Sequence, residues 1–185
     1  MALDAATYLA EGRFTTEITA LAATRDLCVE RIGDRVVCYP SVLRVDPELT
    51  AVEIDGRREY GIRPSRIVAT LEAARSRASR FRAAPFFDAV EAAYLHLTKM
   101  STGRAPIVRL IDIWDLLTLR PGTSSEYSKA EFARDLNLLD ESGVTVGAAG
   151  RTIHFSASSG TRTDAAFSTV GRDGRPHIYW GVSFS

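Results

Sequence analysis

A helix with recognisable signals at both ends lies between residues 128 and 143. Ser128 and Glu131 form a capping box, in which each residue's side chain accepts a hydrogen bond from the other's backbone N–H. Gly143 supplies the left-handed position at which helices commonly end. Between these ends apolar residues recur at helical spacing, which predicts one buried face. The residues of this face are Phe132, Leu136 and Leu139.

The neighbouring segments predict a second helix and a hairpin. Residues 106–119 are apolar nearly all round, begin with a proline that suits a first helical turn, and are followed by Pro-Gly. We therefore expect them to form the central helix of their domain. After the capped helix, two β-prone stretches, residues 144–146 and 152–157, flank the Gly-Ala-Ala-Gly loop at 147–150. This pattern favours a hairpin.

The order helix, helix, hairpin resembles a winged helix, and the resemblance covers residues 105–156. It implies a fold that binds either nucleic acid or other proteins. A strand is also expected around residues 167–170 and another at 177–184, where apolar side chains alternate with others. This alternation predicts that Ile178 faces the core and that Tyr179 lies on the outer face. The hairpin would then be enlarged into a small sheet.

The chain as a whole is predicted to be α+β, in three parts. Residues 1–63 hold two short helices and β-rich sequence, with hairpin turns expected at Gly33-Asp34 and Asp55-Gly56. Helices followed by hairpins make a second, degenerate winged helix one interpretation of this part. Residues 64–99 indicate an Arg-rich central helical hairpin, and residues 100–185 indicate the winged helix with its C-terminal strands.

If the N-terminal part is a second winged helix, the chain resembles the small tandem winged-helix subunits that accompany bacterial SMC-like ATPases. The features that carry this resemblance are the capping box, the glycine stop and the hairpin. The resemblance implies a non-enzymatic adaptor that binds a larger partner or a second copy of itself. It assigns no individual residue, and a shared fold does not by itself establish function.

Charge is balanced overall but unevenly distributed. Residues 57–82 contain eight arginines and only two acidic residues, so this segment can attract polyanions although the whole chain has a net charge of zero. At 100° per residue, Arg66, Arg77 and Arg80 fall on one edge of an apolar stripe. Together with Arg63 they could form a ridge that binds phosphates. The alternative is that their stems cover the flank of a buried stripe.

The outward face of the capped helix argues against DNA binding through that helix. It carries two cations and four carboxylates, and an acidic helix lacks the attraction to phosphates that supplies most non-specific DNA affinity. We therefore expect Glu131 and Asp135 to contact a protein partner. Asn137 is the side chain suited to adenine, and Arg151, on the predicted hairpin, is the candidate contact to phosphate.

The sequence shows no group of residues typical of catalysis, of a cofactor site or of a metal site. The three histidines lack metal-ligand spacing. Asp46, Glu53 and Asp55 faintly resemble the carboxylates of restriction-type nucleases, but Arg57 stands where such a site needs a lysine. Arginine stays protonated and cannot serve as the base. A metal-dependent nuclease is therefore the most distant alternative.

Composition gives three further expectations. No apolar run approaches 18 residues and no signal-peptide pattern is visible, so we expect a cytoplasmic protein without a membrane segment. Cys28 and Cys38 are expected to be reduced, small apolar residues. No small-molecule substrate is indicated.

Two functions remain in competition. The first is a non-catalytic adaptor or accessory subunit of a larger bacterial assembly, one that can include DNA, with the winged helix binding protein. The second is a direct DNA-binding protein such as a transcriptional regulator, which would use the Arg-rich helix and Arg151. An exposed apolar surface would favour the first, and a contiguous basic face the second.

Overall fold

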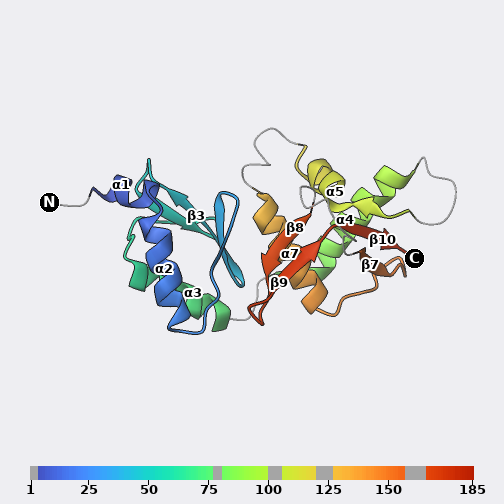
Figure 1. Ribbon diagram of the computed structural model, residues 1–185. Helices are drawn as coiled ribbons and strands as arrows, with labels where there is room; N and C mark the ends of the chain where they lie inside the picture. Colours follow the sequence, from blue (N-terminus) through green and yellow to red (C-terminus); the bar gives the residue numbers. More distant parts are fainter. Residues whose placement is uncertain (1–3, 77–80, 100–105, 120–126, 157–165) are drawn as a thin grey trace. The chain divides into compact units, whose positions relative to one another are not determined.

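The computed structural model describes residues 4–76, 81–99, 106–119, 127–156 and 166–185 (Figure 1). The chain divides into two compact units. The first comprises residues 1–79 and 170–176, and the second comprises residues 80–169 and 177–185. Both units combine helices with antiparallel strands, so the predicted α+β class is confirmed.

The first unit is built on a five-stranded antiparallel sheet in which each strand pairs with the next along the chain. The predicted turns are confirmed. Gly33, Asp55 and Gly56 all have positive φ angles, as tight hairpin turns require. The strands are β1 (Glu30–Ile32), β2 (Arg35–Cys38), β3 (Ser41–Asp46), β4 (Ala51–Ile54) and β5 (Arg57–Glu59).

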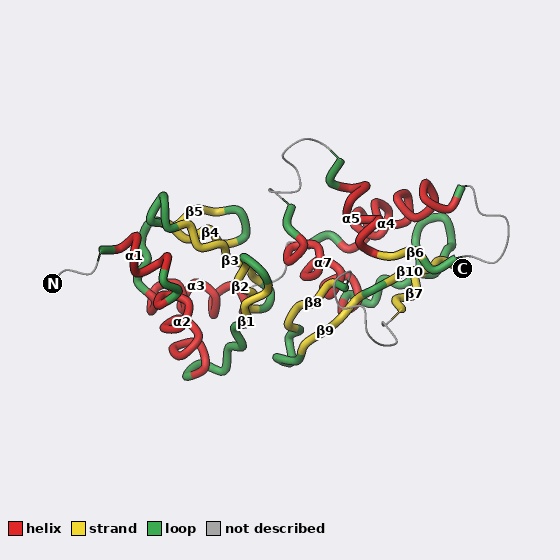
Figure 2. The backbone as a smooth tube through the Cα atoms, turned by 45° about the horizontal axis from the view of Figure 1, so that its top comes forward, coloured by secondary structure: helices red, strands yellow, loops and turns green. Residues whose placement is uncertain are grey.

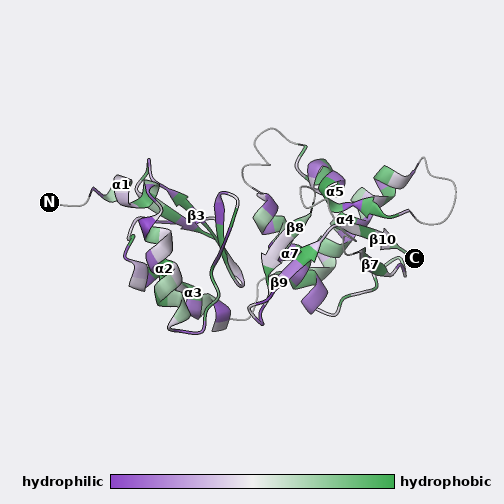
Figure 3. Cartoon of the chain, in the orientation of Figure 1, coloured by the Kyte–Doolittle hydropathy of each residue, from purple (hydrophilic) through white to green (hydrophobic). Residues whose placement is uncertain are grey.

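Three helices cover one face of this sheet (Figures 1 and 2). They are α1 (Ala5–Ala10), α2 (Arg13–Ala23) and α3 (Pro64–Ser76). Val36, Leu43 and Ile54 lie opposite one another on adjacent strands and belong to the core that the helices complete. Helices α2 and α3 each carry both hydrophobic and hydrophilic residues, as elements with one buried side do (Figure 3).

The first unit does not have the second winged helix that the sequence suggested for residues 1–63. Over the described residues 4–76, the strands form one continuous meander and a third helix follows the last strand. The hairpin turns were located correctly. The difference arises because every strand also pairs with the next strand along the chain, which joins the hairpins into one sheet. Local turn signals do not specify this pairing.

The second unit packs three helices against a small sheet. Helix α4 (Ala83–Thr98) contacts both α5 (Leu110–Leu117) and α7 (Lys129–Glu141). Strand β10 (Gly181–Phe184) lies between β6 (Val108–Arg109) and β7 (Ile153–Ser156), and both pairings are antiparallel. Strands β8 (Phe167–Val170) and β9 (Pro176–Tyr179) form a separate two-stranded sheet.

Both end signals of α7 are confirmed. The Ser128 hydroxyl accepts from the Glu131 N–H at 3.3 Å, and the Glu131 carboxylate accepts from the Ser128 N–H at 2.7 Å. Gly143 has a φ of 73°, which is the left-handed conformation expected after the helix. The predicted apolar face lies in the core of the unit. Its residues, Phe132, Leu136 and Leu139, are at most 1% exposed.

Two predicted elements of the second unit are shorter than expected. The helix predicted from residue 106 begins only at Leu110, because Val108 and Arg109 pair with β10 instead. The hairpin predicted around residues 147–150 contracts to one isolated bridge between Val146 and Thr152. Strand β7 pairs with β10 instead, so residues about 28 positions apart in the chain lie opposite one another in the three-stranded sheet.

The predicted C-terminal strand is broken at Trp180, whose carbonyl accepts a hydrogen bond from the Leu110 N–H at 2.9 Å. The break changes which side chains face inward. Tyr179 is 4% exposed and Ile178 is 56% exposed, the reverse of the prediction. The two helices expected within residues 64–99 form as α3 and α4, and they belong to different units.

Candidate recognition surfaces

Helix α7 presents only part of the outward polar face predicted for it. Asp135 is 9% exposed and Asn137 only 1%. The expectation that these two residues lie on an accessible surface is therefore wrong. One side of the helix packs into the apolar core, and polar partners within the same unit occupy another side.

Asp135 is held by two hydrogen bonds. The Tyr127 hydroxyl donates to its Oδ2 at 2.8 Å, and Nε of Arg134 donates to its Oδ1 at 2.9 Å. Burial raises the pKa of the Asp135 carboxyl, an effect that Arg134 opposes. Burial, followed by the nearby Asp135 charge, raises the pKa of Tyr127 above its ordinary range. These hydrogen bonds satisfy a carboxylate that would otherwise be costly to bury.

Asn137 uses both ends of its amide within the second unit. Its Nδ2 donates to Glu141 at 2.9 Å, and its Oδ1 lies 3.2 Å from the Tyr179 hydroxyl, which is also 3.0 Å from Asp140. Burial first, and then the Asp140 charge, raises the pKa of Tyr179, so this phenol stays a donor at neutral pH. Because Asn137 is buried and both ends of its amide have partners, it is not placed to bind adenine.

Strands β8 and β9 supply the cover over α7 (Figures 1 and 2). Tyr179 of β9 makes the hydrogen bonds just described, and the ring of Phe167 of β8 lies 4.9 Å from that of Phe132. The third predicted contact residue of α7, Glu131, is half-buried and its carboxylate accepts from Ser128. Both predicted protein-binding carboxylates therefore have intramolecular partners.

Arg151 is also paired within the second unit. One guanidinium nitrogen lies 2.9 Å from a carboxylate oxygen of Glu91, whose side chain is 10% exposed, whereas that of Arg151 is 41% exposed. Arg151 follows the 147–150 turn and Glu91 lies in α4, so this ion pair ties the turn to the helix. The predicted phosphate contact thus neutralises a buried carboxylate of its own unit.

Replacing Arg151 by Met is expected to lower the free energy of unfolding by about 1–2 kcal/mol. The substitution leaves the Glu91 carboxylate buried without its partner, although solvent at the half-exposed Arg151 reduces the loss. Urea denaturation followed by circular dichroism measures the effect. Adding Glu91→Gln should recover part of the loss. Arg175→Met, at a side chain that is 83% exposed, is the control, and an equal effect of both arginine variants would refute a structural role for the pair.

The predicted arginine ridge is only partly within the described residues. Arg63 and Arg66 are exposed at the start of α3, and Arg66 lies 3.4 Å from Glu59. Arg77 and Arg80 lie outside the described residues. The structure therefore places two of the four arginines near one another and leaves the ridge as a whole untested.

Two of the three carboxylates considered for a nuclease accept hydrogen bonds from the backbone. Asp46 accepts from the Leu49 N–H and Asp55 accepts from the Val42 N–H, both at 3.0 Å. Among the residues that the structure describes, no group of three or more His, Cys, Asp or Glu side chains is placed to hold a metal ion. The nuclease alternative gains no support from this arrangement.

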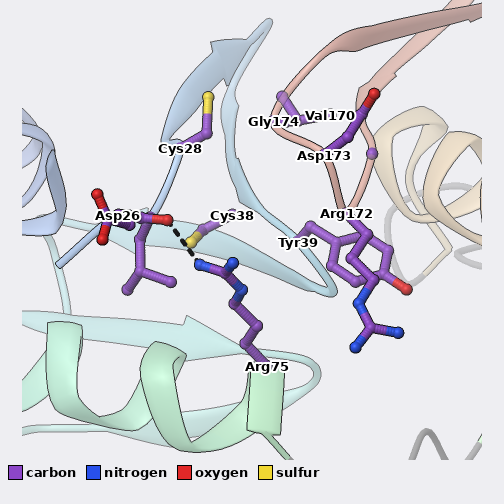
Figure 4. A pocket seen from close by; sticks show the side chains of 11 residues that line it. Asp26, Cys28, Cys38, Tyr39, Arg75, Val170, Arg172, Asp173 and Gly174 are labelled. Atoms are coloured by element: carbon purple, nitrogen blue, oxygen red, sulfur yellow. Dashed lines mark hydrogen bonds between the residues drawn. The ribbon is translucent and has the colours of Figure 1, made fainter.

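A small pocket of about 90 Å³ lies in the first unit (Figure 4). Arg75 crosses it and donates to the Asp26 carbonyl at 2.6 Å. Cys28 and Cys38 both line it as free thiols, and their sulfur atoms point in different directions in Figure 4. Burial raises the pKa of Cys38 to about 11, so its thiol is protonated and unreactive at neutral pH.

Several exposed side chains were missed by the sequence reasoning. In the second unit Ile107, Val146 and Ile178 are each more than half exposed, and in the first unit Tyr60 is 67% exposed. Of these residues, only Tyr60 could have been selected from the sequence as a candidate binding residue, because it follows Arg57-Arg58 in the most basic segment of the chain. Within the described residues, no helix has both the length and the apolar character needed to cross a membrane.

Comparison of the chain with protein-family models, with curated proteins and with solved structures found no match. The candidate surfaces therefore rest on this chain's own residues and contacts.

Proposed function

We propose that this chain is a non-catalytic adaptor, with a winged helix as its second unit that binds protein. The order of elements supports the fold assignment. Helices α5 and α7 are followed by the antiparallel strands β7 and β10, as expected for a winged helix, and the short strand β6 extends their sheet. Helix α4 would be the first of three helices in this domain.

The covered face of α7 is the observation that favours protein over DNA as the partner. A recognition helix reads the major groove through side chains that reach base edges. Here Asn137 is 1% exposed and has hydrogen-bond partners at both ends of its amide, and β8 and β9 lie along the helix. The transcriptional-regulator alternative would use the Arg-rich helix and Arg151, and Arg151 is paired with Glu91, so this alternative is less favoured than the adaptor.

The second unit has exposed apolar side chains that a protein partner could bury. Ile107 is 55% exposed, Val146 is 53% exposed and Ile178 is 56% exposed. When a partner removes such aliphatic side chains from water, the complex is stabilised by about 25 cal/mol for each Å² of apolar surface buried. The partner is a larger protein or a second copy of this chain.

The adaptor proposal predicts that Ile107→Glu and Ile178→Glu each weaken complex formation without lowering the unfolding temperature. Each substitution introduces a charge that must lose water when the partner binds. Self-association is measured by size-exclusion chromatography with light scattering over a concentration series. Capture of a larger partner is measured by affinity purification from the native host with quantitative mass spectrometry.

Leu49→Glu is the matched control, since Leu49 is 47% exposed but belongs to the first unit. It should retain any complex that the wild-type chain forms. Two results together would overturn the proposal. The chain would stay at the 20.2 kDa monomer mass at all concentrations. It would also capture no protein from the host more strongly than the two isoleucine variants do.

A further inference from the structure

The strand β5 and the start of α3 form a basic edge on the first unit. We define this basic edge as Arg57, Arg58, Tyr60, Arg63 and Arg66. All five side chains are exposed, and Tyr60 is 67% exposed. They come from ten consecutive positions, so their proximity does not depend on the placement of the two units.

The arginines of the basic edge are mostly free to bind an external anion. Within the described residues Arg57, Arg58 and Arg63 form no ion pair, whereas Arg66 lies 3.4 Å from Glu59. In register, Glu53 is opposite Arg58 on the neighbouring strand. Residues 53–66 hold these four arginines and three carboxylates, Glu53, Asp55 and Glu59, which leaves a small local excess of positive charge.

Strand β5 lies at the edge of the five-stranded sheet, and both of its arginines are exposed. It pairs only with β4. Successive strand residues point to opposite faces of a sheet, so Arg57 and Arg58 extend to the two sides of this edge. An extended chain of phosphates passing along the edge can reach both guanidinium groups.

Tyr60 supplies an apolar ring beside these charges. A Cβ atom added at Gly61 would lie 3.1 Å from a guanidinium nitrogen of Arg66, so Arg66 passes close to the backbone next to Tyr60. An exposed aromatic ring flanked by arginines is the combination on which proteins stack unpaired bases. Arginine also makes bidentate contacts with phosphate.

We propose that the basic edge binds single-stranded nucleic acid, with arginines on the phosphates and Tyr60 stacked on a base. This site goes beyond the proposed adaptor function, because it lies on the first unit and uses none of the residues assigned to the protein interface. It gives the chain a second, separate binding surface. Bases in a duplex are already stacked on one another, so the exposed ring favours a single strand.

Fluorescence anisotropy with a labelled 20-nucleotide oligo-dT tests the site on the full chain. Binding should weaken as salt rises, and the Arg57→Ala/Arg58→Ala variant should flatten the slope of log affinity against log salt by about 1.4, since each phosphate contact on a single strand contributes about 0.7. Tyr60→Ala should weaken binding roughly 5- to 150-fold, whereas Tyr60→Phe should keep it, because only the ring is needed for stacking.

Arg13→Ala/Arg31→Ala is the matched control for charge. It removes the same two charges from exposed positions on α2 and β1, and it should leave the slope nearly unchanged. The proposal is overturned by any of three results: no binding at roughly 50 mM salt, where phosphate contacts are strong; equal losses in the two double-arginine variants; or a 20-base-pair duplex bound as tightly as the single strand. None of these results bears on capture of a protein partner by the second unit.

Discussion

Leu136→Asp should lower the free energy of unfolding by about 3–5 kcal/mol, the largest effect expected for this chain. Leu136 is fully buried on α7, in the core that this helix shares with α4. A carboxylate at that position would lie among apolar side chains without a cation or hydrogen-bond donor. Urea denaturation monitored by far-ultraviolet circular dichroism gives the change directly.

Leu119→Asp is the control for this substitution. It makes the same chemical change in the same unit, at a side chain that is 72% exposed, and should alter stability by no more than about 0.5 kcal/mol. An unfolding curve for Leu136→Asp that coincides with that of the wild type would mean that the buried face of α7 has been assigned incorrectly.

Gly147→Ala is expected to destabilise the chain by about 3 kcal/mol, at the upper end of the range for an overfilled core. An added Cβ would lie 2.2 Å from Cε1 of Phe87, well inside the 3.5–4.0 Å at which two carbon atoms pack favourably. Phe87 is fully buried on α4 and its ring also contacts that of Phe184, 5.6 Å away, so it has little room to move.

The matched control for Gly147→Ala is Ala148→Val, which enlarges the next residue of the same turn at an exposed position. Thermal unfolding should distinguish the two variants by several degrees. Combining Gly147→Ala with Phe87→Leu should cost less than the sum of the single changes, because the smaller side chain makes room for the methyl group. Additive losses would show that the glycine and the ring do not meet.

The local features of the fold were predictable from short stretches of sequence. The capping box at Ser128 works through atoms only three residues apart, and the Asp55-Gly56 turn needs only two residues with positive φ. Such features depend on neighbours in the chain. The tertiary contacts of a segment do not alter them, which explains why they were placed correctly.

The pairing of distant elements was not predictable in the same way. Asn137 is buried because Tyr179, 42 residues further along, reaches its amide. Helical periodicity classifies an asparagine as a surface residue, and it cannot show that a later strand supplies a partner. The break at Trp180 has the same origin, since its carbonyl is used by Leu110, which lies in a different element.

The basic edge was visible in part. Arg66 was placed on the predicted ridge because it falls on the same helical edge as Arg77 and Arg80, and Arg63 was added to them, so the predicted ridge ran along a helix toward Arg80. The structure adds Arg57 and Arg58 through the edge position of β5, and Tyr60 through its exposure. A sequence does not reveal which strand of a sheet is left unpaired on one side.

The central position of β10 affects the order in which the second unit can form during translation. This strand holds the three-stranded sheet together, because β6 and β7 each pair with it and not with each other. Its residues are made more than 70 positions after β6. A nascent chain therefore carries β6 and β7 without their common partner until Phe184 has left the ribosome.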